Sequence, residues 1–215
     1  MIIPTLNAAQ TLPATLASLR GVPAEVLVVD GGSADDTVAV AGRLGARVLV
    51  APRGRGAQVA AGCAAARQAW LLLLLADTQL GEGWPGVVAA HISGVPDRAG
   101  YFRFTLDSDD PRARRLERAV VWRCRAFALP YGDQGLLIHR DLLRAVGGMR
   151  PLPLMEDVDL AGRLGRHRLV ALTADAITST DKWRRDGWYR RSLRNLACLS
   201  LYFAGVPPRL IARLY

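Results

Sequence analysis

The chain has 215 residues and a net charge of +9, with 51% apolar and 22% charged residues. These values fit one globular domain and exclude a disordered chain. Three widely spaced cysteines without a CxxC pair exclude a disulfide framework. The longest apolar runs, residues 69–76 and 196–206, are shorter than the roughly 20 residues of a membrane span. No signal peptide opens the chain, so a cytoplasmic protein is expected.

The first half alternates short apolar runs with helical patterns, which predicts an α/β domain with a parallel sheet and right-handed crossovers. Ser33 is expected to cap the second helix. Strands are predicted at residues 2–3, 25–30, 47–51 and 70–75, and helices at 8–19, 33–45 and 54–69.

The second half has a different pattern, with longer helices between single strands. The tail from Trp188 onward is predicted to be helical and broken at Pro207-Pro208. A loop and helix are predicted within residues 80–91, strands at 100–106, 135–139 and 168–172, and helices at 111–127, 140–146 and 156–164.

Polar side chains end three strands of the predicted parallel sheet. Ligands bind outside the carboxyl ends of such strands, so Thr5, Asn7, Asp30 and Asp77 are expected to meet at one edge. Asp30 could bind a ribose or a base N–H, although VVDGGS also fits an ordinary turn. Asp77 follows five leucines and needs a partner. A divalent cation on a diphosphate and a helix cap are equally open at this point.

Two adjacent acids, Glu156 and Asp157, open a predicted helix. Helix geometry separates their directions by about 100°, so one can face a substrate while the other bonds backbone or a basic residue. The alternative is that these acids only complement the positive end of the helix dipole.

Five stretches, in this order, resemble the family-2 glycosyltransferases with a GT-A fold. They extend over most of the chain up to about residue 165. The stretches are IIPTLNAAQTLPATLASL (2–19), VLVVDGGSADDT (26–37), GRGAQVAAGCAAARQAWLLLLLADT (54–78), GDQGLLIHRDLLRAVGGM (132–149) and PLMEDVDLAGRL (153–164).

This resemblance implies a GT-A domain over residues 1–185, a mostly parallel sheet flanked by helices, and a helical tail over 186–215. It implies an inverting transfer of sugar from a nucleotide-diphosphate sugar to an acceptor hydroxyl, with Mg²⁺ or Mn²⁺ as cofactor. Asp157 would be the catalytic base and Asp77 the metal ligand. The substrate-binding residues would be Pro4, Thr5 and Asn7 at the nucleotide base, Asp30 at the base or ribose, Arg55 and Asp77 near the donor, Glu156 beside the catalytic base, and Asp133 and Gln134 near the acceptor.

Two departures from the family pattern concern the diphosphate end of the site. Leu75 takes the place of the first acid in the Asp-x-Asp motif, so metal binding would depend on Asp77. The arginine-rich motif after the last strand is replaced by TDKWRR (180–185), which could still hold phosphate. The variants ADT, GDQG and MEDVDL look closest to a compact bacterial subgroup, some members of which are labelled arsenosugar-biosynthesis glycosyltransferases.

Two other functional classes are alternatives to a glycosyltransferase. A nucleotidyltransferase should carry a glycine-rich basic loop after the first strand, where this chain has Pro4-Thr5-Leu6-Asn7. A non-catalytic nucleotide-binding module remains an alternative. No nucleic-acid partner is expected, because the known sequence signatures are absent. The basic tail with its aromatic residues either packs on the domain or binds the inner face of a membrane peripherally.

Overall fold

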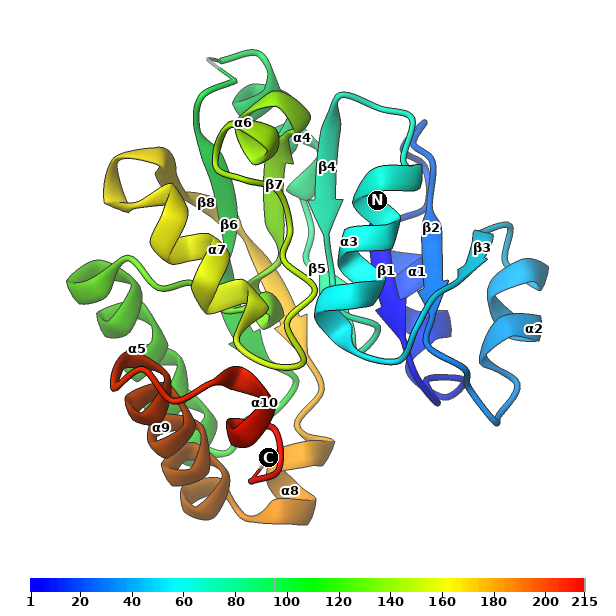
Figure 1. Ribbon diagram of the computed structural model, residues 1–215. Coiled ribbons are helices and arrows are strands. Elements are labelled where there is room, and N and C mark those ends of the chain that lie inside the picture. Colours follow the sequence, from blue (N-terminus) through cyan, green and yellow to red (C-terminus); the bar gives the residue numbers. More distant parts are fainter. Residues whose placement is uncertain (95, 215) are drawn as a thin grey trace.

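The computed structural model describes residues 1–94 and 96–214. Its centre is an eight-stranded sheet with the order β3-β2-β1-β4-β7-β6-β8-β5, covered by helices on both faces (Figure 1). The pairs β1/β2, β1/β4, β2/β3 and β6/β8 are parallel, whereas β4/β7, β6/β7 and β5/β8 are antiparallel. The predicted mostly parallel α/β sheet is confirmed.

The first half follows the predicted alternation closely. Its elements are β1 Ile2–Thr5, α1 Leu12–Ser18, β2 Leu27–Asp30, α2 Thr37–Arg43, β3 Arg47–Val50, α3 Arg55–Ala65 and β4 Trp70–Leu73. All residues of β1 and β2 are buried, as expected for strands with helices on both faces.

Successive residues of these strands enter two separate cores. Ile3 and Val28 pack with α1, α2 and α4, whereas Ile2 and Val29 pack with α3, α6 and α7. This division follows from the two-residue period of a strand, which sends neighbouring side chains to opposite faces. Gly62 lets α3 approach the second face, because a Cβ there would collide with Ile2. The result is a rigid base below the carboxyl ends of β1, β2 and β4.

The second half differs from the prediction at two strands. The short strand β5 was not predicted, and β8 extends six residues beyond the expected end at residue 172. The two pair with each other from Thr78 opposite Thr178 to Leu80 opposite Ala176. The elements are β5 Thr78–Leu80, α4 Trp84–Ile92, β6 Ala99–Leu106, α5 Pro111–Phe127, the 3₁₀ turn η1 Gly132–Gln134, β7 Leu136–His139, α6 Arg140–Ala145, α7 Glu156–Leu164, η2 Arg166–Arg168 and β8 Leu169–Thr178.

Three helices follow β8: α8 Asp181–Asp186, α9 Trp188–Phe203 and α10 Pro208–Ile211. The expected boundary between residues 185 and 186 falls at the end of α8. Cys198 of α9 and Ile211 of α10 are buried in one cluster with Leu129 and Val158. Among the described residues, no helix is both long and apolar enough to cross a bilayer.

One local expectation is wrong, and one of two open alternatives is excluded. Ser33 does not cap α2, which begins at Thr37 after Asp36. The Ser33 hydroxyl instead donates to Asp30, and Asp35 accepts the backbone N–H of Thr37. Asp77 does not cap a helix either, because it is followed by β5. The helix-cap alternative for Asp77 is therefore excluded.

Candidate active site

A solvent-open cavity of about 1280 Å³ lies at the carboxyl ends of β1 and β4. Pro4, Thr5 and Asn7 line one side of it, and their contact with a nucleotide base stays a prediction. Its other lining residues are Leu6, Ala8, Gln10, Thr11, Arg53, Gly54, Arg55, Gln58, Leu75, Ala76, Asp77, Ser179, Asp181, Lys182 and Arg185. Four of these side chains are cationic and two are acidic, so the cavity suits an anionic ligand.

Asp30 ends β2 and turns into the loop that follows it. Its carboxylate accepts hydrogen bonds from the Thr5 hydroxyl (3.0 Å), from the Gly32 and Ser33 backbone N–H groups (2.9 and 2.8 Å) and from the Ser33 hydroxyl (2.5 Å). Burial alone would raise the pKa of Asp30, but these hydrogen bonds outweigh it and lower the pKa. Asp30 is 2% exposed and does not line the large cavity. Its contact with a base or ribose stays a prediction.

The loop held by Asp30 supports Asn7 at the cavity wall. The Asn7 backbone N–H donates to the Ser33 hydroxyl (2.8 Å), and the Asn7 side-chain oxygen accepts from the Ala34 N–H (2.8 Å). Asn7 has a φ of 52°, in the left-handed region that asparagine tolerates better than most residues. Asp30 therefore supports the wall of the large cavity indirectly, through the loop that holds Asn7 in place.

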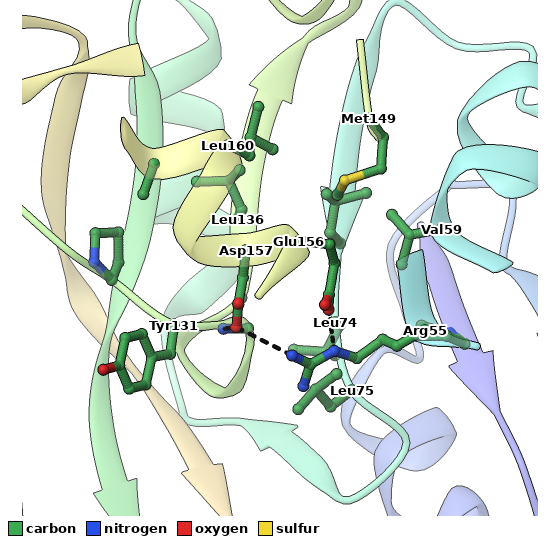
Figure 2. A pocket seen from close by; sticks show the side chains of 16 residues that line it. Arg55, Val59, Leu74, Leu75, Tyr131, Leu136, Met149, Glu156, Asp157 and Leu160 are labelled. Atoms are coloured by element: carbon green, nitrogen blue, oxygen red, sulfur yellow. Dashed lines mark hydrogen bonds and ion pairs between the residues drawn. The ribbon is translucent and has the colours of Figure 1, made fainter. Parts of the chain in front are cut away.

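Arg55, at the start of α3, binds both acids at the start of α7 (Figure 2). Its Nε donates to Glu156, and its terminal nitrogen lies 3.3 Å from Asp157 Oδ2. Gly56 permits this approach, because a Cβ at that position would collide with the backbone of Leu152. A small residue next to Arg55 therefore brings α3 against the segment that leads into α7.

Glu156 and Asp157 differ in exposure and in partners. The Glu156 side chain is 3% exposed, and burial and the nearby Asp157 raise its pKa against the effect of Arg55. Asp157 is more accessible, with 18% of its side chain exposed. Its Oδ2 also accepts from the Gly132 N–H at 2.8 Å, and its Oδ1 accepts from the Val158 N–H at 2.9 Å. The backbone therefore fixes Asp157 in orientation while leaving it in contact with a cavity.

Asp77 lies after β4 and is paired with Lys182 of α8. The ammonium nitrogen is 2.5 Å from Asp77 Oδ2. Leu75 lies two residues before Asp77, as the sequence indicated, and supplies no ligand. Within residues 1–94 and 96–214, no cluster of three or more His, Cys, Asp or Glu side chains could hold a metal ion. A metal at Asp77 would therefore need most of its ligands from elsewhere.

A second cavity, of about 700 Å³, connects these groups. Asp77, Asp133 and Asp157 all line it. Arg55, Leu75, Asp77 and Lys182 line both this cavity and the large one. The remaining lining residues are Tyr131, Gly132, Leu154, Met155, Val158, Thr178, Trp183, Arg191 and Asn195. The two carboxylates expected to hold metal and to take a proton thus face one shared space.

The two residues expected near the acceptor have different surroundings. Asp133 lines the second cavity, and burial raises its pKa to about 6, with Arg123 opposing the shift. Gln134 is 2% exposed and points into the interior, where its amide donates to the Phe102 carbonyl and accepts from Arg123. Gln134 therefore braces the η1 turn from behind and does not line the second cavity.

A third pocket, of about 540 Å³, lies on the other side of Asp157 and is walled mainly by apolar side chains (Figure 2). Val59 of α3, Leu136 of β7 and Leu160 of α7 contribute to it, with Met149 closing one side. Asp157 and Arg55 thus lie on the boundary between an apolar and a polar space.

Sequence reasoning missed the contribution of the C-terminal helices to the second cavity. Arg191 and Asn195 of α9 line it, although residues 186–215 were treated as a tail. Sequence reasoning also did not identify the partner of Asp77. Lys182 is the one lysine among 28 basic residues, and this unusual residue type was the available signal.

The chain is similar in sequence to proteins of other organisms. Uncharacterized glycosyltransferases of Mycobacterium bovis and Mycobacterium tuberculosis are 38% identical to the chain over 139 residues, covering 62% of this chain. The match spans 62% of the length of these relatives.

Solved structures share the fold at low sequence identity. Glucosyl-3-phosphoglycerate synthase from Mycobacterium tuberculosis, in complex with Mn²⁺ and UDP-glucose, has a TM-score of 0.62 at 19% identity, covering 96% of this chain and 78% of that one. Mannosyl-3-phosphoglycerate synthase from Rubrobacter xylanophilus has a TM-score of 0.59 at 18% identity, covering 95% and 74%. The architecture is thus the GT-A fold. Residues 1–150 match glycosyl transferase family 2, and the chain belongs to that family.

Proposed function

We propose that the chain transfers a sugar from a nucleotide-diphosphate sugar to an acceptor hydroxyl, with inversion at the sugar carbon. One observation carries this proposal: Asp77 and Asp157, which lie 80 residues apart in the sequence, line the same cavity. Asp77 also lines the larger cavity at the end of β1. A donor spanning the two cavities would have its diphosphate near Asp77 and its sugar toward Asp157.

The large cavity has the groups that a nucleoside diphosphate needs. Arg53, Arg55, Lys182 and Arg185 supply positive charge along its wall, and arginine in particular suits phosphate oxygens because of its fork of donors. Pro4, Thr5 and Asn7 would border the base. The structural relative that binds UDP-glucose with Mn²⁺ supports uridine nucleotides as the first donors to test.

The residues at Asp77 fit a metal that is shared with the donor, and they do not fit a metal held by protein alone. Mg²⁺ typically takes one or two carboxylates together with phosphate oxygens and water. Asp77 would supply the carboxylate, and Lys182 would have to give up its place on Oδ2. When bound, such a metal would offset the charge that develops on the leaving diphosphate.

Asp157 would act as the base. The acceptor oxygen would bond to the sugar carbon as the bond to the diphosphate breaks, and the acceptor proton would pass to an Asp157 carboxylate oxygen. Gly132 and Arg55 hold this carboxylate from two sides. Lys182 and Arg185 would remain with the diphosphate and stabilise its charge. Asp133 would border the acceptor.

The likeness of the sequence to the compact bacterial subgroup stays a prediction.

A thermal-shift screen of UDP-, GDP- and dTDP-sugars, with and without Mn²⁺, tests the donor. A ligand that binds only the folded chain stabilises it by about 2.7 kcal/mol at a hundred times its dissociation constant. We expect one nucleotide class to raise the melting temperature, and Mn²⁺ to increase the effect. Release of nucleoside diphosphate should then be measured with the same donor.

The outcomes separate the alternatives. A shift without any diphosphate release, even with a panel of hydroxyl acceptors, would indicate a non-catalytic nucleotide-binding module. A shift with nucleoside triphosphates and release of pyrophosphate would indicate a nucleotidyltransferase. No shift with any diphosphate sugar would sink the proposal.

A further inference from the structure

The positive charge of the chain is concentrated in four helices. Residues 111–127, which form α5, carry six arginines and one glutamate, and residues 181–215, which contain α8 to α10, carry eight basic and two acidic residues. Together these stretches have a net charge of +11, so the rest of the chain carries −2. The net charge of +9 is therefore a property of one region.

Helices α5 and α9 lie side by side, at the same end of the molecule as α8 and α10 (Figure 1). The Arg112 guanidinium at the start of α5 lies 5.5 Å from the ring centre of Trp188 at the start of α9. Val120 of α5 is buried in one cluster with Trp188. Cys198 of α9 is buried with Leu129, which follows α5 directly. The helices thus form one layer.

An apolar stripe runs along the outer side of α9. Tyr189, Leu193, Leu196 and Phe203 are 71%, 68%, 58% and 62% exposed. Their spacing of four, three and seven residues places them on one helix face. Large apolar side chains in such a row differ from the single exposed ones that any protein surface carries.

A second exposed group lies on α5. Trp122 and Phe127 are 63% and 57% exposed and meet edge to face, with ring centres 5.4 Å apart. Arg118 and Arg115 precede Trp122 by one and two turns and are exposed on the same face. Among the described residues, neither arginine has an acidic group within ion-pair distance, and the same holds for Arg190 beside the α9 stripe.

We propose that α5 and α9 form a surface that docks on an anionic lipid bilayer. Peripheral helices of this kind bury apolar side chains at the headgroup boundary while arginines attract anionic lipid. A second copy of the chain fits this surface poorly, because self-association would bring two strongly cationic layers together. A nucleic acid would match the charge, but it would leave the apolar stripe of α9 without a contact.

The same helix that carries the stripe also borders the second cavity. Arg191 and Asn195 of α9 line the cavity that Asp157 and Asp77 share. The stripe and the cavity are thus separated by about the 10 Å diameter of one helix. Docking would place that cavity beside the lipid headgroups, while the docking itself does not depend on catalysis.

Co-sedimentation of the full chain with vesicles tests this surface. We expect binding to phosphatidylcholine vesicles that contain phosphatidylglycerol, little binding to pure phosphatidylcholine, and loss of binding in about 1 M salt, where the Debye length is about 3 Å. Replacing Arg115, Arg118 and Arg190 by Gln should lower the partition coefficient about a hundredfold, at about fivefold per charge. The variant L193S/L196S should also weaken binding.

A matched control removes the same charge elsewhere. Arg20, Arg43 and Arg67 are exposed outside the helical layer, and their replacement by Gln should leave vesicle binding within a few-fold. Equal loss in this control would overturn the proposal, as would equal binding to neutral vesicles. A dimer in solution that L193S/L196S dissociates would also overturn it. Circular dichroism confirms folding of each variant, and because the assay contains no donor, its failure leaves the transferase proposal unaffected.

Discussion

Two aspartates, Asp30 at the end of β2 and Asp77 after β4, lie at the carboxyl ends of the two strands that pair with β1, and they have opposite surroundings. Asp30 accepts four hydrogen bonds from its own loop and from Thr5. Asp77 is paired with the side chain of Lys182, 105 residues away in the sequence, and lines two cavities. The Asp30 carboxylate is occupied by its own loop, whereas the single ammonium on Asp77 can be exchanged for another partner. Position at a strand end therefore does not distinguish these two acids; contact with a cavity does.

Asp157 extends this comparison and gives the largest expected effect. Asp157→Asn should lower turnover about a hundred- to ten-thousandfold, because a positioned base is lost, while donor binding in the thermal-shift assay survives. Asp159→Asn is the matched control. Asp159 lies in the same first turn, but Arg150 and Arg163 bind its two oxygens at 2.8 and 2.7 Å.

This control distinguishes a catalytic role of Asp157 from a purely electrostatic interaction of the α7 acids with the helix dipole. If the acids of α7 only complement the dipole, both variants should lose similar stability and neither should lose turnover selectively. Full turnover of Asp157→Asn, measured as nucleoside diphosphate release, would contradict its assignment as the base.

Asp77→Asn should reduce donor affinity about ten- to hundredfold, as expected for loss of a charged bonding partner, and should abolish the response to Mn²⁺. Lys182→Gln should have the opposite effect on the affinity for the metal. Because the ammonium no longer competes for Asp77, the Mn²⁺ concentration at half-maximal shift should fall roughly two- to fivefold. An unchanged Mn²⁺ response in both variants would show that the metal does not bind at Asp77.

Asp30→Asn should have the smallest effect on turnover and a clear effect on stability, about 1–3 kcal/mol in the free energy of unfolding. The pKa of Asp30 lies below its ordinary value of 3.8. Its contribution to stability is therefore present above pH 3.8 and is lost as the pH falls through the lower folded pKa. Urea denaturation measures this effect at pH 7 and in acid. In acid, the free energy of unfolding of the wild type should approach that of the variant. A constant difference between them would contradict the hydrogen-bonded role.

The sequence predicted the first half of the fold well, because each of its strands contains a short apolar run and helical patterns separate these runs. Strand β5 could not be predicted in the same way. Thr78, Gln79 and Leu80 show no clear periodicity, and they form a strand because β8 lies alongside them. Non-local pairing of this kind leaves no local pattern in the chain.

The site was predicted only in part, for a related reason. The resemblance implied site roles for Pro4, Asn7, Asp77 and Asp157, and these residues lie on cavity walls, while their roles stay predictions. Gln134 was expected near the acceptor, but the direction of its side chain could not be predicted, because it depends on Phe102 and Arg123, which come from other elements. Contacts across a hundred residues, such as that of Arg55 with α7, likewise require the folded chain.

The presence of a single lysine has a practical consequence. A chain of 215 residues with one lysine carries one side-chain amine, and that amine lies at the junction of the two cavities. An amine-selective reagent would therefore attach to side chains at one known position. The rate of that labelling would report directly on whether the junction is occupied, without a radioactive sugar or a known acceptor.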